Sequence, residues 1–274
     1  MDLNEMLSYG FMQRALIGGS LIAILCSVLG VFLVLRRLSL IGDGLAHVTF
    51  GSVALTLLFR LQSVYMTLAV IPVVLASALG ILKLAQKARI YGDAAIGMVS
   101  AIGIATGVLL ASVAGGFNVD LFSYLFGNIL SISWSELAIA AGLFIIVIAG
   151  VIMFYNELFA STFDEELAKS SGLDTDRINA VLVLLTALTV VLAMKVVGIM
   201  LISALLILPA VSALQVAKGF KAAIISAAAI GVGTVICGIS VSFVLNLPTG
   251  ATIVIINFVV FLLALAVRSL LRHP

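Results

Sequence analysis

An acid and an imidazole, Asp43 and His47, interrupt a stretch of the sequence that is otherwise strongly apolar. Residues four apart lie on one face of a helix, one turn from each other, so these two side chains are placed to act together. Carboxylate and neutral imidazole are both common zinc ligands, and zinc in proteins usually has four. Such a pair can also relay protons inside a membrane, where ionisable side chains are costly and face the bundle interior or a watery path.

The composition places this pair in a membrane protein. Of the 274 residues, 64% are hydrophobic and 9% are charged, whereas soluble domains carry about 25% charged residues. Apolar runs of about 20 residues, the length that a helix needs to cross a bilayer, recur from end to end. We therefore expect a single all-α domain over residues 1–274, a polytopic helix bundle in a lipid bilayer. The net charge of +2 comes from residues between the spans, so it indicates no nucleic-acid partner.

The apolar runs predict eight or nine transmembrane segments. Segment 115–133 is too polar to span, and the first run is read as a span because no small-residue cleavage site follows it. Only Lys195-Val196-Val197 separates the sixth run from the seventh, so these are either two full crossings or one broken pair. The predicted spans are 14–35, 44–60, 64–82, 93–114, 134–155, 178–194, 198–217, 222–246 and 250–267.

The basic residues predict the orientation, because cytoplasmic loops carry an excess of Lys and Arg. If the chain starts outside, eleven of its fourteen basic residues fall on the inner side. Only Arg14, Arg60 and Lys195 then fall outside or at span ends. We expect an outer amino end and a cytoplasmic carboxyl end.

Two glycines in the fourth apolar run place small residues on one face of the predicted helix. Gly103 and Gly107 are four apart, a spacing that lets the backbones of two helices approach closely. Packing within one chain and dimerisation explain this spacing equally well.

The spacing of Asp43 and His47 allows two interpretations. In one, both side chains bind a metal ion. In the other, Asp43 caps the start of the second span and His47 forms a hydrogen bond in the core. One chain offers no other obvious ligand, since His273 lies near the end of the basic tail. Two copies meeting at a two-fold axis would supply two carboxylates and two imidazoles.

The longest polar stretch, 157–177, predicts a short amphipathic helix. Its acidic residues come early and its basic residue late, and a glycine follows as a stop. The segment is either a docking surface for a partner or a solvated connector. The residues that would form the surface are Asp164, Glu165, Glu166, Lys169 and Gly172.

Three stretches resemble the permease subunits of bacterial metal-ion ABC importers, which carry zinc, manganese or ferrous iron. They are 36–47 (RRLSLIGDGLAH), 120–130 (DLFSYLFGNIL) and 193–210, in the family's order. The resemblance implies a homodimer in the bacterial inner membrane, served by two cytoplasmic ATP-binding subunits and an extracytoplasmic metal-binding protein. It associates Asp43 and His47 with the metal path and makes 157–177 the seat of the ATPase. It also implies alternating access between the two copies.

The resemblance favours the zinc branch, through Leu45-Ala46-His47 and through Lys195-Val196-Val197-Gly198. Manganese members tend to have a proline shortly after the histidine, which is absent here. Manganese or ferrous iron is the alternative cargo. A proton-coupled secondary transporter, with Asp43 and His47 as the relay, is the alternative class. The sequence has no GxxxxGK[ST] phosphate loop, so we expect no enzymatic activity of its own and no permanently bound cofactor.

Overall fold

The computed structural model describes residues 8–59, 63–87, 92–113, 127, 132–196, 198–199 and 202–271. Within these ranges, eight helices are long and apolar enough to cross a membrane, as expected. The helices are α2 (Gly10–Leu35), α3 (Ile41–Leu58), α4 (Ser63–Lys87), α5 (Gly92–Val113), α7 (Trp134–Met153), α8 (Tyr155–Phe163), α9 (Glu165–Ser170), α10 (Thr175–Val196), α11 (Ile202–Val216), α12 (Phe220–Leu245) and α13 (Thr249–Leu271). The second motif of the resemblance, 120–130, lies outside these ranges except for Gly127. Arg60 and His273 also lie outside them.

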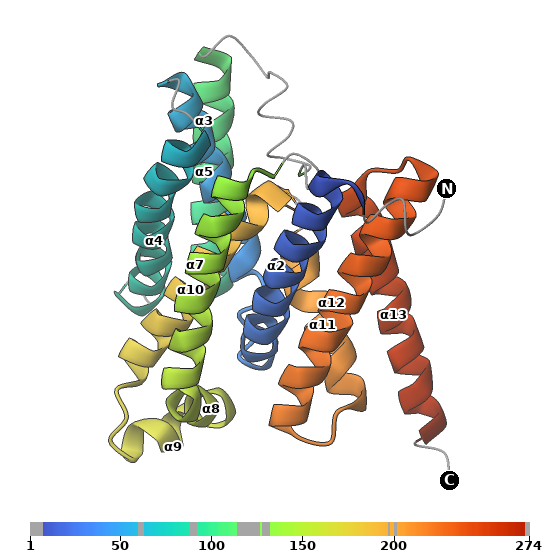
Figure 1. Cartoon of the computed structure of the whole chain (residues 1–274). Helices are drawn as coiled ribbons and strands as arrows, with labels where there is room; N and C mark the ends of the chain where they lie inside the picture. Colours follow the sequence, from blue (N-terminus) through green and yellow to red (C-terminus); the bar gives the residue numbers. More distant parts are fainter. Residues whose placement is uncertain are drawn as a thin grey trace.

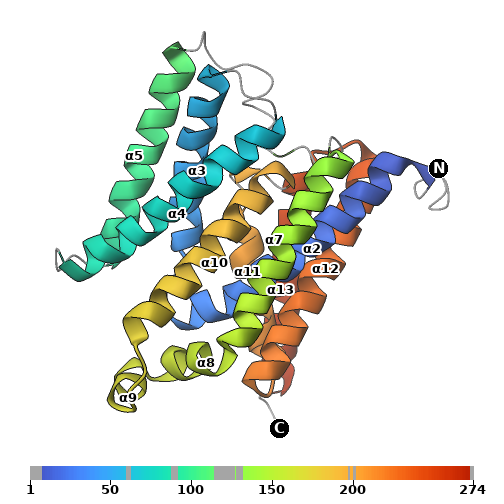
Figure 2. The ribbon, with the colours of Figure 1, turned by 60° about the vertical axis from the view of Figure 1, so that its left-hand side comes forward.

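Three of the eight long helices form the inside of the bundle. The apolar windows of α2 and α3 are each 72% buried and that of α10 is 67% buried, whereas those of α4, α5, α7, α12 and α13 are 39% buried or less. The inner helices therefore pack against protein along most of their length, and the outer ones present apolar faces to the surroundings. Figures 1 and 2 show α3, α4 and α5 grouped on one side, with α12 and α13 on the other.

The sixth and seventh predicted segments differ in length. Helix α10 has 22 residues and is a full span, whereas α11 has only 15. At 1.5 Å per residue, α11 extends over about 22 Å, which is short of the roughly 30 Å hydrocarbon core. Gly198, between the two helices, has φ 87°, a conformation that glycine adopts without strain. The seventh predicted segment is therefore a shortened helix and not a full-length span.

The two ends of the bundle carry different features. At one end Arg36, which follows α2, contacts α8 and α9, and both helices lie at the bottom in Figure 1. At the other end the guanidinium of Arg14 donates to the carbonyl of Ile132 at 2.7 Å and lies 5.6 Å from the ring centre of Trp134. The predicted orientation makes the first end cytoplasmic.

Helix α8 was not expected from the sequence, which indicated only a polar segment after the fifth span. Its aromatic residues bind it to the start of α12: the rings of Phe159 and Phe163 lie 5.1 and 5.6 Å from that of Phe220. Phe32, near the end of α2, packs edge-on against Phe220 at 5.2 Å. The cluster fixes α8 across the end of the bundle.

The small face at Gly103 and Gly107 packs within the chain, against α3. A Cβ at Gly103 would lie 2.8 Å from the backbone carbonyl of His47, and one at Gly51 would lie 2.8 Å from the carbonyl oxygen of Gly103. The backbones of α3 and α5 therefore touch, which only glycine permits. This seam holds the helix that carries Asp43 and His47.

Candidate functional site

Asp43 and His47 are the partly exposed positions in an otherwise buried stretch of α3. From Ile41 to Ala54, every residue of α3 is buried except these two. Their side chains are 47% and 23% exposed, respectively. The surroundings of α3 thus leave a single line of access, and both potential ligands stand on it.

The two side chains face each other at a distance that leaves their lone pairs available. His47 Nε2 lies 3.5 Å from Asp43 Oδ2, which is longer than the 2.7–3.2 Å typical of an N–H···O hydrogen bond. The other carboxylate oxygen, Oδ1, accepts a hydrogen bond of 3.2 Å from the hydroxyl of Ser203. Ser203 lies in the first turn of α11, so the carboxylate joins α3 to the shortened helix.

Asp43 does not cap α3. The N-cap residue is Leu40, with no side-chain hydrogen bond, and Asp43 lies inside the first turn. Other polar side chains of α3 are satisfied within the helix: Thr49 donates to the carbonyl of Leu45 and Ser52 to that of Val48. The cap interpretation of Asp43 is therefore wrong, and its role must come from its contacts across the bundle.

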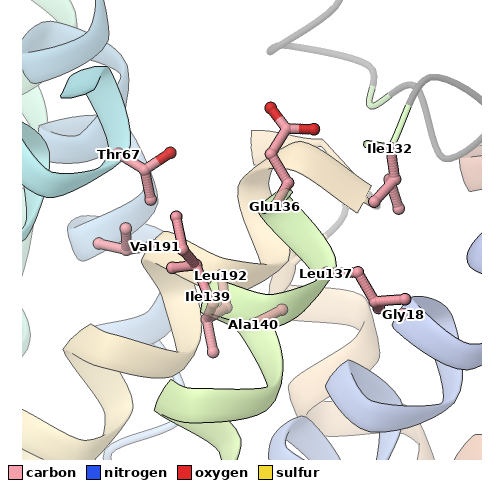
Figure 3. A pocket seen from close by; sticks show the side chains of 9 residues that line it. All are labelled: Gly18, Thr67, Ile132, Glu136, Leu137, Ile139, Ala140, Val191 and Leu192. Carbon is pink, nitrogen blue, oxygen red and sulfur yellow. The ribbon is translucent and has the colours of Figure 1, made fainter. Parts of the chain in front are cut away.

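One chain supplies too few donors for a closed metal site. Among the described residues, no group of three or more His, Cys, Asp and Glu side chains gathers in one place. The small pocket of about 30 Å³ between α2, α4, α7 and α10 is elsewhere, and Figure 3 shows its mainly aliphatic lining. Its one charged side chain, Glu136, accepts from the backbone N–H of Ser133 in a capping box.

The segment 157–177 contains the predicted short helix, α9. Asp164 is its N-cap and accepts a 2.9 Å hydrogen bond from the N–H of Leu167. Gly172 follows its end with φ 90°, and the N–H groups of Gly172 and Leu173 donate back to the last turn. These are the bonds of a Schellman motif, so Gly172 ends the helix as expected.

The charged residues of α9 differ in their surroundings. Glu166 and Lys169 are exposed, as a docking surface requires. Glu165 is also exposed, but it accepts a 2.8 Å hydrogen bond from the Nδ2 of Asn179 in α10 and pairs with Arg36 at 3.6 Å. Sequence reasoning missed these partners and Ser203, because nothing in the local spacing links residues that lie 14 to 160 positions apart.

The family model for the ABC 3 transport family matches residues 8–268. The chain belongs to that family. It is 33% identical over 261 residues to the manganese transport system membrane protein MntC of Halalkalibacterium halodurans, covering 95% of this chain and 88% of the relative. It is 31% identical over 255 residues to the high-affinity zinc uptake system membrane protein ZnuB of Haemophilus influenzae, covering 93% and 97%.

A solved structure, PsaBC from Streptococcus pneumoniae in complex with Fab, has a similar fold. Its TM-score is 0.85 at 31% sequence identity, with 96% of this chain and 93% of that chain covered. The expected family of ABC permease subunits and the expected all-α membrane fold are therefore confirmed. With eight apolar spans among its described residues, the chain is a multi-pass membrane protein. The relatives are named for two different metals, so the comparisons do not choose between zinc and manganese.

Proposed function

We propose that the chain is the membrane subunit of an ATP-driven zinc importer, in which two copies hold the ion between their Asp43 and His47 side chains. The observation that carries the proposal is that α3 is buried from Ile41 to Ala54 except at these two residues. Ionisable side chains exposed at one opening in an apolar helix mark an ion path.

The separation of the two donor atoms suits binding of both to one metal ion, and the choice of zinc rests on the resemblance of 45–47 and 195–198 to the zinc branch. Two ligands bound to one tetrahedral zinc ion at about 2.0–2.1 Å are about 3.4 Å apart. Asp43 Oδ2 and His47 Nε2 are 3.5 Å apart. Manganese is the second candidate, because several relatives, MntC among them, are named for it.

The donor count supports a site shared between two copies. The described part of one chain gathers only two strong donors at this place, whereas zinc takes four. A two-fold axis beside the opening of α3 would bring the missing carboxylate and imidazole from the second copy. No permanently bound cofactor is needed, because the ion is the cargo.

The surface of 157–177 supports a cytoplasmic ATPase as the source of energy. Phe163 and Leu167 are 62% and 63% exposed beside the charged Glu166 and Lys169. Apolar side chains ringed by charges are typical of a surface that binds a protein partner. Membership of an ABC transport family favours this energy source over a proton gradient.

Uptake into proteoliposomes tests the proposal. The dimer is reconstituted with its ATPase, the extracytoplasmic binding protein and ATP, and zinc and manganese are offered separately and in competition. We expect zinc to be taken up in preference and Asp43→Asn to lower uptake by at least about tenfold. Asp93→Asn is the matched control, because Asp93 is the exposed first-turn acid of α5. Full zinc uptake by Asp43→Asn would refute the site, and preferred manganese uptake would refute the choice of metal.

A further inference from the structure

Arg36 occupies an unusual position for a guanidinium at the end of a membrane span. Its side chain is only 5% exposed. Its Nη2 donates a 3.0 Å hydrogen bond to the hydroxyl of Ser161 in α8 and lies 3.6 Å from Glu165 Oε2 in α9. Burial lowers the pKa of Arg36, and the carboxylate of Glu165 opposes that shift. A charge buried at this cost is held in place by its partners.

The same contacts tie four helices together. Glu165 receives Arg36 on Oε2 and the Nδ2 of Asn179 on Oε1, so its carboxylate bridges the end of α2 and the start of α10. Within the described structure, Nη1 of Arg36 is a buried donor with no acceptor, and Oδ1 of Asn179 is a buried acceptor with no donor. These two atoms belong to the same two side chains that the carboxylate of Glu165 joins.

A hydrogen-bonded turn connects Arg36 directly to the helix of the metal site. The N–H groups of Arg37 and Leu38 donate to the carbonyls of Val34 and Leu33, which is a Schellman ending with Arg37 at φ 57°. The N–H of Ile41 then donates to the carbonyl of Leu38 at 3.0 Å and opens α3. Asp43 follows two residues later, so little free backbone separates Arg36 from the site.

We propose that Arg36 is a positioning residue that couples the ATPase seat to the metal site, transmitting displacements of α8 and α9 through the turn after α2 to α3. The inference rests on the proposed function, because it requires an ATPase bound at 157–177. Displacement of α9 moves Glu165 and with it the guanidinium of Arg36, and the turn after α2 passes this movement to α3, which carries Asp43 and His47. Arginine suits this position because its long side chain and rigid planar group hold one nitrogen, Nη2, beside both Ser161 and Glu165.

The test compares two neighbouring arginines. Arg36→Lys keeps the charge but removes the planar group that holds Nη2 between Ser161 and Glu165, whereas Arg37→Lys alters the exposed arginine beside it. Each variant is purified with the ATPase and assayed in proteoliposomes for bound ATPase and for zinc uptake per ATP hydrolysed. We expect Arg36→Lys to retain the ATPase and to lower uptake per ATP about tenfold, equivalent to about 1.4 kcal/mol. Arg37→Lys should match the unaltered chain.

A second, milder variant tests the coupling role in case Arg36→Lys fails to fold. Ser161→Ala removes one hydrogen bond of Arg36 and should lower uptake per ATP in the same direction, with the thermal midpoint of the complex unchanged. If Arg36→Lys assembles and transports like the unaltered chain, the coupling role is refuted while the proposed function stands. If Arg36→Lys releases the ATPase, Arg36 shapes the seat and transmits nothing. If the unaltered chain binds no ATPase, the proposed function itself fails.

Discussion

The carboxylate of Asp43 divides its two oxygens between two tasks. Oδ1 accepts from Ser203, and Oδ2 faces His47. A hydroxyl that donates to one oxygen fixes the plane of the carboxylate and leaves the other free for an ion. Groups that orient metal ligands in this way commonly contribute about 10- to 100-fold in metal affinity.

Ser203 is therefore expected to set the affinity of the site without binding the ion. Ser203→Ala should weaken zinc binding by about tenfold, because Asp43 loses its orientation. Isothermal titration of the purified dimer measures the change. Ser212→Ala is the matched control on the same helix, since the Ser212 hydroxyl donates to the carbonyl of Leu208 in its own helix. Equal affinities for both variants would remove Ser203 from the site.

At the scale of elements, the position of the metal-site helix depends on glycine. Gly103→Ala would place a Cβ 2.8 Å from the backbone of His47, which cannot move aside as a side chain can. We expect a loss of about 1–3 kcal/mol from overpacking, seen as a lower thermal midpoint in detergent, together with reduced metal uptake.

Gly97→Ala is the control for that change on the same helix. A Cβ there meets nothing within 4 Å, and alanine favours the helix by up to about 1 kcal/mol. Its thermal midpoint should stay level or rise. A Gly103→Ala protein as stable and active as Gly97→Ala would show that the seam between α3 and α5 is loosely packed.

The elements that could be predicted are those with a long apolar period. Runs of about 20 residues located the spans, and the acids, glycine and lysine of 164–172 located α9. Helix α8 escaped because Tyr155, Phe159 and Phe163 follow α7 with no glycine or proline to mark a boundary. The shortness of α11 and the contact between Ser203 and Asp43 depend on tertiary packing, which no local pattern encodes.

The whole molecule has two chemically different ends, and their orientation is testable. In a chain with Cys26 and Cys237 replaced by alanine, a cysteine at exposed Ser135 should react with a membrane-impermeant thiol reagent in intact cells. A cysteine at exposed Ser170 should react only after the cells are opened. The reason is the excess of basic residues at the end that carries α9. The reverse pattern would place 157–177 outside and remove the ATPase from it.

A shared site also makes a prediction about two joined copies. If each copy lends one carboxylate and one imidazole to a single ion, the dimer binds one zinc per two chains. A tandem fusion with Asp43→Asn in one half then loses one of four ligands from its only site. Equilibrium dialysis should give an unchanged capacity of one ion per fusion but a lower affinity, by about tenfold or more. Two independent sites would give the opposite result, because the intact half would keep its affinity while the capacity of the fusion fell by half. A shared site therefore lowers the affinity alone, whereas two independent sites lower the capacity alone. The same fusion with Asp93→Asn in one half should change neither quantity.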